Sequence, residues 1–373
     1  MKRINSLTVV RRCLAGLSMG ALGSLAMAAP QTPAGPEGKE VEYVFSANQA
    51  SHSVSAYRID TATGMLQALT GKAPTVGRYP VSIAAAPDGR TVYVANQGSN
   101  SISAFRVDPA TDSLRPIPGS PFAVGQYPDA VIIHPSGAWA FVSNEDADTL
   151  QVYALDKNTG ALGAQQDDAK TGRHPIDVTV SPNGRFVYVS NFYDHSVSAY
   201  RFDETTGSLT PLAQKAQTED RPIYISVTPD NRYAFVANYG SVTVSAFRIN
   251  NDSGELTPVP GSPFTAGAQP YSVTVDPSER YVYVANWGSH DVSAFRLDNN
   301  TGTLHEIGGS PYAADWFPYA VVVDPSDHFV YVANNGAGNI SAYTMSPQTG
   351  ALSLLQTAKS GLGPYGLIAT RLR

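Results

Sequence analysis

The feature that most constrains the fold is a five-residue stretch, Val92-Tyr93-Val94-Ala95-Asn96, because versions of it recur along the whole chain. Its final asparagine returns at intervals of 47 or 48 residues, at Asn48, Asn96, Asn144, Asn191, Asn238, Asn286 and Asn334. A repeat of this length that carries only strand signals is typical of the blades of a β-propeller. The 373 residues could hold two ordinary domains, but the unbroken period predicts one closed ring of seven blades.

One repeat, residues 80–127, shows what each blade should contain. Short apolar or alternating runs at 81–86, 91–96, 101–107 and 113–117 are separated by turn sequences such as Pro87-Asp88-Gly89-Arg90. Four consecutive runs joined by tight turns predict a four-stranded antiparallel sheet. The mature chain has no stretch with a helical period, so we expect an all-β fold.

The two ends of the repeat region fit together. The first repeat begins at its second strand, within residues 41–48, and has no inner strand of its own. The chain ends with residues 364–372, which read as an inner strand with no blade to follow. We therefore expect a seven-bladed β-propeller over residues 41–373 in which the C-terminal inner strand completes the first blade.

The N-terminal residues predict export from the cytoplasm. A basic start is followed by an apolar run over 14–28, and Ala26-Met27-Ala28 fits a cleavage site. The run is short and rich in Gly, Ala and Ser, which favours a cleaved signal over a membrane anchor. We expect a signal peptide over 1–28, a flexible leader over 29–40 and a periplasmic or secreted protein. Arg11-Arg12 also fits a twin-arginine signal.

Composition limits the chemistry that the mature chain can perform. The only cysteine, Cys13, lies in the expected signal, so the mature protein would have no thiol nucleophile and no thiolate ligand. Removing the four basic residues of the signal changes the formal net charge from −6 to −10. This balance disfavours nucleic acid and anionic membranes as partners, and we expect neither. We expect a monomer with no cofactor and no membrane span.

Three repeated motifs resemble those of a known family. The Tyr-Val-x-Asn strand ends, the x-Pro-Asp-Gly-Arg turns and the Thr-Gly-x-Leu turns are similar to those of the YVTN-repeat propellers of the lactonase family, which includes bacterial 6-phosphogluconolactonases. The resemblance covers residues 41–373 and implies a lactone hydrolase. Phosphogluconolactonase-type members carry an Asn-Glu pair, retained here as Asn144-Glu145, and a His-Pro-His-Ser element, of which His174-Pro175 matches. Where those members carry Arg and His, this chain has Asp129 and Ala130.

A candidate site follows from the strand order. In a four-stranded meander, the loop into the inner strand and the loop after the second strand lie at the same end, so both surround one mouth of the central channel. These loops differ between repeats and carry charged and aromatic side chains, a composition typical of ligand sites. The candidate substrate-binding residues are Arg78, Arg173, Arg221, Asp177, Tyr193, Tyr239, Trp287, Trp316 and Phe317.

Two residues are candidates for catalysis at this mouth. His174 stands beside Arg173 and near Asp177, and it could act as a general base. Glu145 is the second candidate base, and the arginines could hold a carboxylate or a developing oxyanion. The run Glu145-Asp146-Ala147-Asp148 is interpreted as an acidic loop rather than a metal site. His52, His134, His305 and His328 are expected on outer or opposite-end positions.

Each of these features also has a purely structural interpretation. The seven asparagines would cap turns by bonding local backbone, and the aromatic side chains could plug the channel. The arginines could form solvated ion pairs with Asp129, Asp177 and Glu145.

Two functions therefore remain open. One is an exported lactonase-like hydrolase acting on a sugar or another small lactone. The other is a non-catalytic extracytoplasmic propeller that binds a glycan or a protein partner through its aromatic residues.

Overall fold

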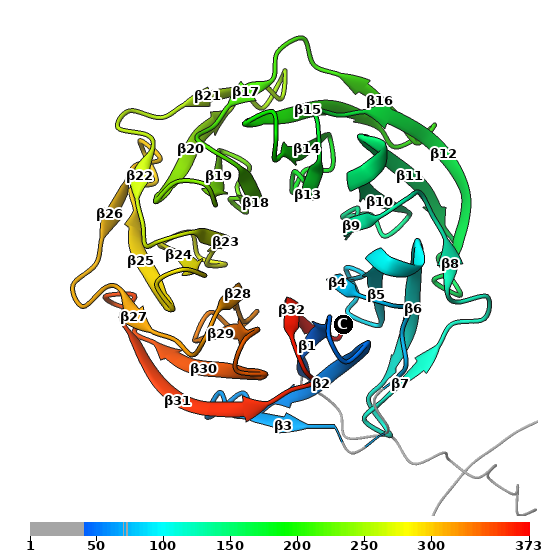
Figure 1. Ribbon diagram of the computed structural model, residues 1–373, viewed down its shortest axis with the longest axis horizontal. Helices are drawn as coiled ribbons and strands as arrows, with labels where there is room; N and C mark the ends of the chain where they lie inside the picture. Colours follow the sequence, from blue (N-terminus) through cyan, green and yellow to red (C-terminus); the bar gives the residue numbers. More distant parts are fainter. Residues whose placement is uncertain (1–40, 70, 72–73) are drawn as a thin grey trace, which may run out of the picture. The chain divides into compact units, whose positions relative to one another are not determined.

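The computed structural model describes residues 41–373 except 70 and 72–73. The expected signal peptide and leader lie outside the described residues. Seven antiparallel sheets surround one axis (Figure 1). Their inner strands β4, β9, β13, β18, β23, β28 and β32 contact one another in sequence around a closed circle. The predicted seven-bladed propeller is therefore confirmed.

The first three blades follow the chain order, apart from the inner strand of the first. Blade 1 contains β1 (Glu42–Asn48), β2 (Ser53–Ile59), β3 (Leu66–Ala68) and the C-terminal β32 (Pro364–Arg371). Blade 2 contains β4 (Pro80–Ala85), β5 (Thr91–Asn96), β6 (Ser101–Asp108), β7 (Ser113–Pro116) and β8 (Phe122–Ala123). Blade 3 contains β9 (Pro128–Ile133), β10 (Trp139–Asn144), β11 (Thr149–Leu155) and β12 (Leu162–Lys170).

The other four blades repeat this pattern. Blade 4 contains β13 (Pro175–Val180), β14 (Phe186–Asn191), β15 (Ser196–Asp203), β16 (Ser208–Pro211) and β17 (Ala216–Gln217). Blade 5 contains β18 (Pro222–Val227), β19 (Tyr233–Asn238), β20 (Thr243–Ile249), β21 (Leu256–Pro258) and β22 (Phe264–Thr265). Blade 6 contains β23 (Pro270–Val275), β24 (Tyr281–Asn286), β25 (Asp291–Leu297), β26 (Leu304–Glu306) and β27 (Tyr312–Ala313). Blade 7 contains β28 (Pro318–Val323), β29 (Phe329–Asn334), β30 (Asn339–Met345) and β31 (Leu352–Lys359).

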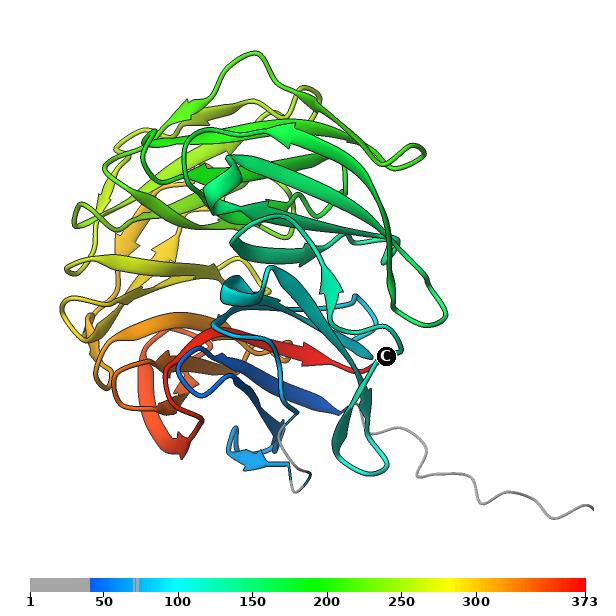
Figure 2. The same ribbon diagram turned by 45° about the vertical axis from the view of Figure 1, so that its right-hand side comes forward.

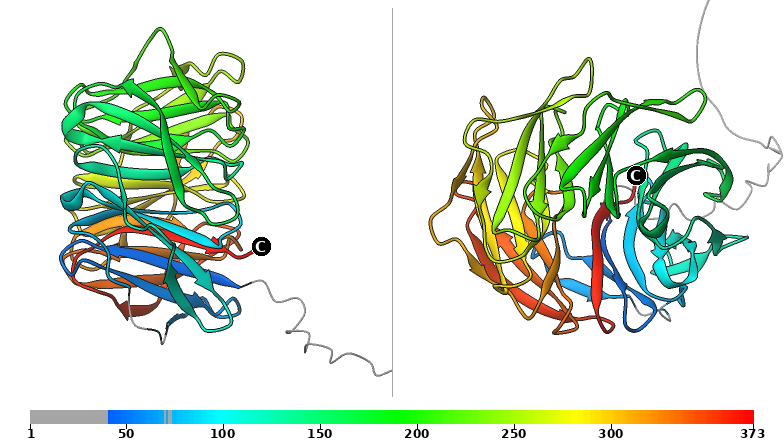
Figure 3. Two further views of the ribbon diagram at one scale, coloured as in Figure 1. Left: turned by 90° about the vertical axis from the view of Figure 1, so that its right-hand side faces the viewer. Right: turned by 45° about the horizontal axis from the view of Figure 1, so that its top comes forward.

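The only helical elements among the described residues are two short 3₁₀ turns, η1 (Gln97–Ser99) and η2 (Glu145–Ala147). No helix in this described part is long and apolar enough to cross a membrane. Seen edge-on in the left view of Figure 3, the strands run between the two faces of the ring, and the turns lie along both faces.

The apolar core lies between neighbouring blades rather than inside any one of them. Seven clusters of buried side chains each join two adjacent blades, and the second strand of every blade contributes to them. All six residues of β5, for example, are buried. A single sheet could not bury both of its apolar faces, so each blade depends on its neighbours for stability.

The repeated tyrosine and glycine belong to one contact between neighbouring blades. The buried hydroxyl of Tyr93 donates to the carbonyl of Gly160, and the hydroxyl of Tyr283 donates to that of Gly350, both at 2.8 Å. Gly350 has a φ of 71°, and a Cβ there would lie 2.4 Å from the Tyr281 ring. Glycine is therefore required both by its left-handed backbone and by the close approach of the ring.

The repeated asparagines stabilise the blades from within. All seven are buried. In all seven the side-chain amide crosses the hairpin to a side-chain oxygen of the third strand, and in six of them to two such oxygens, as Asn96 does to Ser101 and Ser103. The expected bonds to local backbone are present at Asn96, Asn144 and Asn191, but the side-chain acceptors five and seven residues on are the contacts that recur. Their role is nevertheless structural.

The ring is closed by the two ends of the propeller, as the sequence predicts. Strand β32 pairs antiparallel with β1, for example Phe45 with Ile368, and Figure 2 shows the two strands lying together. Arg371 on β32 also donates to Oε1 of Glu42 on β1, at 2.8 Å from Nε and 2.6 Å from Nη2. The side chain of Glu42 is almost fully buried.

Deleting residues 364–373 should strongly destabilise the propeller, because the deletion exposes the hydrogen-bonding edge of β1 and removes the inner strand of blade 1. We expect loss of cooperative folding at 37 °C, or a fall of well over 10 °C in Tm. A control that lacks only residues 372–373 keeps β32 and should melt within a few degrees of the full chain. Equal melting of both truncated proteins would refute the closure by β32.

Candidate functional site

The loops that the sequence places at one mouth do lie together. In all seven blades, the residue after the repeated Asn donates its backbone N–H to the carbonyl of the residue before the repeated Pro. These bonds join Gln49 to Gly363, Gln97 to Tyr79, Glu145 to Tyr127, Phe192 to His174, Tyr239 to Arg221, Trp287 to Gln269 and Asn335 to Phe317. The expected arrangement of the mouth is therefore confirmed.

The residue before the repeated Pro has an unusual backbone in every blade. It lies in the left-handed region, with φ between 51° and 66°, although six of the seven are not glycine. In five blades its N–H donates to a side chain of the preceding blade; for example, His174 N–H donates to Oδ1 of Asp148 at 2.8 Å. This bond offsets the cost of the left-handed backbone and fixes where His174 stands.

Three mouth histidines perform the same structural task as Asp148. His52, His195 and His290 each accept a backbone N–H through Nδ1, from Tyr79, Arg221 and Phe317 respectively. The outer or opposite-end placement of His52 was therefore wrong, because its turn follows β1 and faces the mouth. In the equivalent contact of His174, the backbone N–H of His174 is the donor and Asp148 is the acceptor, so the imidazole of His174 takes no part in it.

The imidazole of His174 lies against the carboxyl group of Glu145 of the preceding blade. Nε2 of His174 lies 2.5 Å from Oε1 of Glu145, and the two side chains are 24% and 12% exposed. The sequence names both residues as catalytic candidates but places His174 near Asp177 and Arg173. The pairing arises because the residue after the Asn of one blade packs against the residue before the Pro of the next blade. Trp287 and Phe317 pack in the same way.

A second carboxyl is linked to this pair through Gln97. Nε2 of Gln97 lies 2.8 Å from Oε2 of Glu145 and 3.3 Å from Oδ1 of Asp129. The four side chains come from blades 2, 3 and 4. They form a connected group, which we call the His–Glu group: His174, Glu145, Gln97 and Asp129.

Two carboxyls are buried where this group meets the channel. Asp129 and Asp177 are 6% and 9% exposed. Burial first, and then the nearby Glu145 and Asp177 carboxylates, raise the pKa of Asp129 well above its ordinary value. Burial raises the pKa of Asp177 to about 7, although hydrogen bonds from the backbone of Ile225 and Val178 act against the shift. Asp177 can therefore hold a proton near neutral pH, and Asp129 keeps its proton to a higher pH than an exposed aspartate does.

Four tyrosines fill the channel beside these carboxyls. Tyr224, Tyr271, Tyr319 and Tyr365 come from β18, β23, β28 and β32, and the ring of Tyr319 lies 4.3 Å from that of Tyr271 and 4.4 Å from that of Tyr365. The space left beside Asp129 and Asp177 is about 10 Å³, enough for about one water molecule. The space beside these carboxyls is therefore too small for a ligand larger than water.

The surface aromatic side chains form a continuous chain, which we call the aromatic arc. It begins at Tyr193, whose ring centroid lies 4.6 Å from that of His174, and ends at Trp316. Neighbouring rings along it lie between 4.7 and 6.3 Å apart. Its members are Tyr193, Phe192, Tyr239, Trp287, Phe317 and Trp316. The channel tyrosines therefore have the plugging role expected as one possibility for the aromatic side chains. Tyr193 and Trp316 of the aromatic arc are instead 49% and 65% exposed to solvent.

The arginines are held by partners other than the expected ones. Arg173 pairs with Asp194 at 2.7 Å, and Arg78 donates to the carbonyl of Gly98 at 3.0 Å. Arg221 lies 4.0 Å from Asp220, with its guanidinium carbon 5.8 Å from the Phe192 ring centroid. Among the described residues, no Lys or Arg forms an ion pair with Asp129, Asp177 or Glu145. The expectation of ion pairs there was wrong, because these side chains turn toward their own loops.

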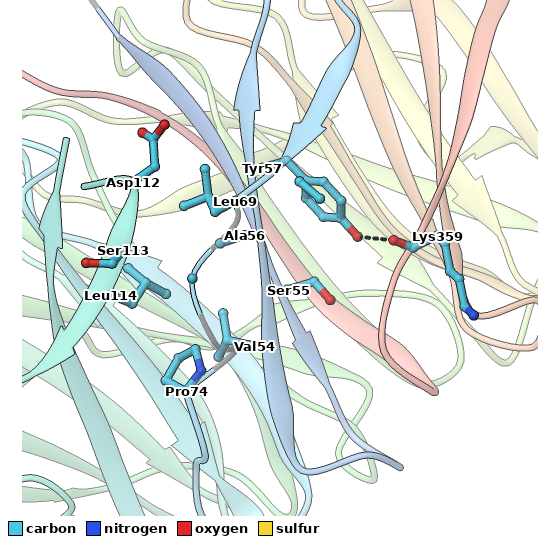
Figure 4. Close-up of a pocket in the computed structure, with 12 residues that line it drawn as sticks. Val54, Ser55, Ala56, Tyr57, Leu69, Pro74, Asp112, Ser113, Leu114 and Lys359 are labelled. Atoms are coloured by element: carbon cyan, nitrogen blue, oxygen red, sulfur yellow. Dashed lines mark hydrogen bonds between the residues drawn. The ribbon is translucent and has the colours of Figure 1, made fainter. Parts of the chain in front are cut away.

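A larger cavity lies away from the mouth, at the outer edge between blades 1 and 2 (Figure 4). It measures about 160 Å³ and is lined mainly by apolar side chains such as Val54, Leu69 and Leu114. Ser53 pairs with Thr75 as Ser101 pairs with Ala123, so Pro74 stands at the position equivalent to Phe122, whose ring packs against the core between blades 2 and 3. The side chain of Pro74 is smaller than that of Phe122.

Comparison with known proteins points to one family. The family model described as "Lactonase, 7-bladed beta-propeller" matches residues 70–176, 168–260 and 255–365, well over half of the chain. Comparison with curated proteins finds no match.

Similar solved structures share the architecture. A 6-phosphogluconolactonase candidate from Bacteroides uniformis is 19% identical, with a TM-score of 0.77, over 89% of this chain and 99% of its own. The periplasmic gluconolactonase of Pseudomonas aeruginosa is also 19% identical, with a TM-score of 0.75, over 90% of this chain and all of its own. At this identity the similarity establishes the fold alone.

The buried carboxyl of Asp177 should make stability depend on pH. Its pKa is about 7 in the folded protein and about 3.9 in an unfolded chain, so the folded state keeps a proton that the unfolded state releases. The free energy of unfolding should therefore fall as pH rises from about 4 to 7, by up to about 1.4 kcal/mol per pH unit. Asp177→Asn keeps an acceptor for Ile225 N–H and should reduce this slope in urea titrations. An unchanged slope would show that Asp177 does not hold the proton.

Proposed function

Because the chain belongs to the seven-bladed β-propeller lactonase family, we propose that it is a lactonase-type hydrolase that opens a sugar lactone or another small lactone at the mouth of its channel. The observation that carries the proposal is the 2.5 Å contact between His174 Nε2 and Glu145 Oε1. The structural neighbours named after gluconolactone and 6-phosphogluconolactone support lactones as the substrate class.

His174 is the base that activates water. Nε2–H of His174 donates a hydrogen bond to the Glu145 carboxylate. The other ring nitrogen, Nδ1, is then the one that takes a proton from water. The water oxygen then attacks the ring carbonyl carbon. Glu145 stabilises the imidazolium that forms, and Gln97 holds the second oxygen of Glu145 in place.

The protonated channel carboxyls supply the complementary acid. When the C–O bond of the ring breaks, the departing alkoxide must gain a proton to become a hydroxyl group. Asp129 is joined to Glu145 through Gln97, and burial raises the pKa of its carboxyl and so favours the protonated form. The base and acid roles then fall to two different groups, His174 and Asp129.

The aromatic arc orients the substrate ring. Tyr193 and Phe192 both contact His174, at ring centroid distances of 4.6 and 5.6 Å. A lactone ring stacked on either would bring its carbonyl toward His174, which supplies the proximity that the reaction needs. Arg78, Arg173 and Arg221 would then contact the solvent-facing part of the substrate.

Substituting the two members of the pair should abolish most of the activity. With a panel of sugar lactones in a pH-stat, we expect His174→Ala to lower kcat/KM by about 10² to 10⁴, and Glu145→Gln to lower it by at least about tenfold. His195→Asn is the matched control, since Asn100 accepts the same backbone bond in blade 2. It should retain activity within about twofold. Hydrolysis that persists in the double variant His174→Ala, Glu145→Gln would remove this pair from the mechanism.

A second function is favoured by the length of the aromatic arc. The arc crosses blades 4 to 7, further than one small lactone needs, and such a surface also suits a non-catalytic propeller that binds a glycan or a protein partner. On a glycan array, Trp287→Ala should weaken any binding by at least about tenfold. Leu354→Ala, which changes an exposed residue on β31, should leave it intact. An array with no bound glycan would count against this function.

A further inference from the structure

The aromatic arc continues well beyond the candidate reaction centre. His174 lies at the end of the arc in blade 4, beside Tyr193 and Phe192. A lactone ring stacked on either of these two side chains would leave the rings from Tyr239 to Trp316, in blades 5 to 7, uncovered. Those rings are therefore available to a second part of the same substrate.

Trp316 provides an open aromatic surface at the far end of the arc. Its side chain is 65% exposed, more than any other aromatic side chain in the described part of the chain. The imidazole of His290 is stacked with it, with ring centroids 6.0 Å apart and planes at 17°, and so covers part of one face of the indole. The backbone N–H of Trp316 donates to Oδ1 of Asp315, and its carbonyl accepts from the N–H of Gly336. The indole is therefore held in place without a ligand, which lowers the entropy cost of binding one.

Two side-chain amides lie along the same stretch of the mouth. Gln269 and Asn335 are joined by backbone hydrogen bonds to Trp287 and Phe317, which are members of the arc. Both side chains are half-buried, and neither side-chain amide forms a hydrogen bond with any described residue. A primary amide both donates and accepts, as a sugar hydroxyl group does. Aromatic faces with amides beside them therefore suit a saccharide, whose rings have C–H faces and hydroxyl edges.

We propose that the substrate is a lactone that carries at least one further sugar residue, with the lactone ring at His174 and the attached sugar on the arc toward Trp316; the proposal rests on the lactonase function above. The attached sugar stacks on the rings and bonds through its hydroxyl groups to Gln269 or Asn335. An alkyl chain would also cover the rings, but it would desolvate the two amides without giving them partners, which costs free energy. Contacts remote from the reacting carbonyl supply binding energy that raises kcat/KM.

Comparison of lactones with different attached groups tests the proposal. We would measure kcat/KM of the full protein for the δ-lactones of gluconic, cellobionic and maltobionic acid, and for δ-decalactone, which carries an alkyl chain. At least one disaccharide lactone should exceed gluconolactone by at least about tenfold, and δ-decalactone should not. Trp316→Ala should bring this ratio to within about twofold of one. Tyr79→Ala is the matched control, because Tyr79 is 49% exposed at the mouth but lies outside the arc. It should leave the ratio unchanged.

The outcomes separate the extended substrate from the lactonase function. Hydrolysis of all the lactones with no advantage for either disaccharide would leave the lactonase function in place and overturn the extended substrate. The extended substrate would also be overturned if δ-decalactone were the best substrate, or if Tyr79→Ala removed the advantage and Trp316→Ala did not.

If no lactone is hydrolysed, the lactonase function falls, and binding of the corresponding lactams decides whether the sugar site exists. In calorimetry, tighter binding of a disaccharide lactam than of gluconolactam, lost in Trp316→Ala, would support a sugar site that extends from His174 along the arc. Equal binding of the lactams, or no binding at millimolar concentration, would overturn it.

Discussion

The rest of the structure depends on the packing of each sheet against its two neighbours around a closed ring. No blade can bury both of its faces alone, so stability is spread over seven equivalent interfaces. The pairing of β32 with β1 completes the last of these interfaces. The Tyr–Gly hydrogen bond recurs at four of these interfaces, and the buried Asn recurs within all seven blades, so these residues serve the fold rather than a ligand.

Closure also explains why variation is concentrated at one mouth. The repeated backbone bonds hold the residue after each Asn next to the residue before each Pro, whatever their side chains are. The residue before each Pro has a left-handed backbone, which presents its side chain to the preceding blade. Glu145 meets His174 through this geometry, as Trp287 meets Phe317. The fold fixes where these side chains lie, and the residue types in blades 2 to 4 determine the chemistry that we propose for the His–Glu group.

Sequence reasoning predicted the elements set by repetition, and it was less successful with contacts between single residues. The seven blades, the closing strand and the composition of the mouth follow from periodicity and turn chemistry. The pairing of His174 with Glu145 does not, because the two residues belong to different blades and meet only through the ring geometry. The arginines were misassigned because local partners such as Asp194 compete effectively for a flexible side chain. A plug of aromatic side chains was expected as one of two possible roles, and the four channel tyrosines fill it; the sequence did not separate them from the aromatic arc, because each comes from a different inner strand.

The central claim is that the His–Glu group and the adjacent end of the aromatic arc form a reaction centre for a lactone. A crystal structure with bound gluconolactam tests this most directly. The account predicts a ring that contacts Tyr193 or Phe192, with its carbonyl carbon one water molecule away from Nδ1 of His174. A lactam bound instead in the cavity between blades 1 and 2, or at the mouth far from His174, would contradict it.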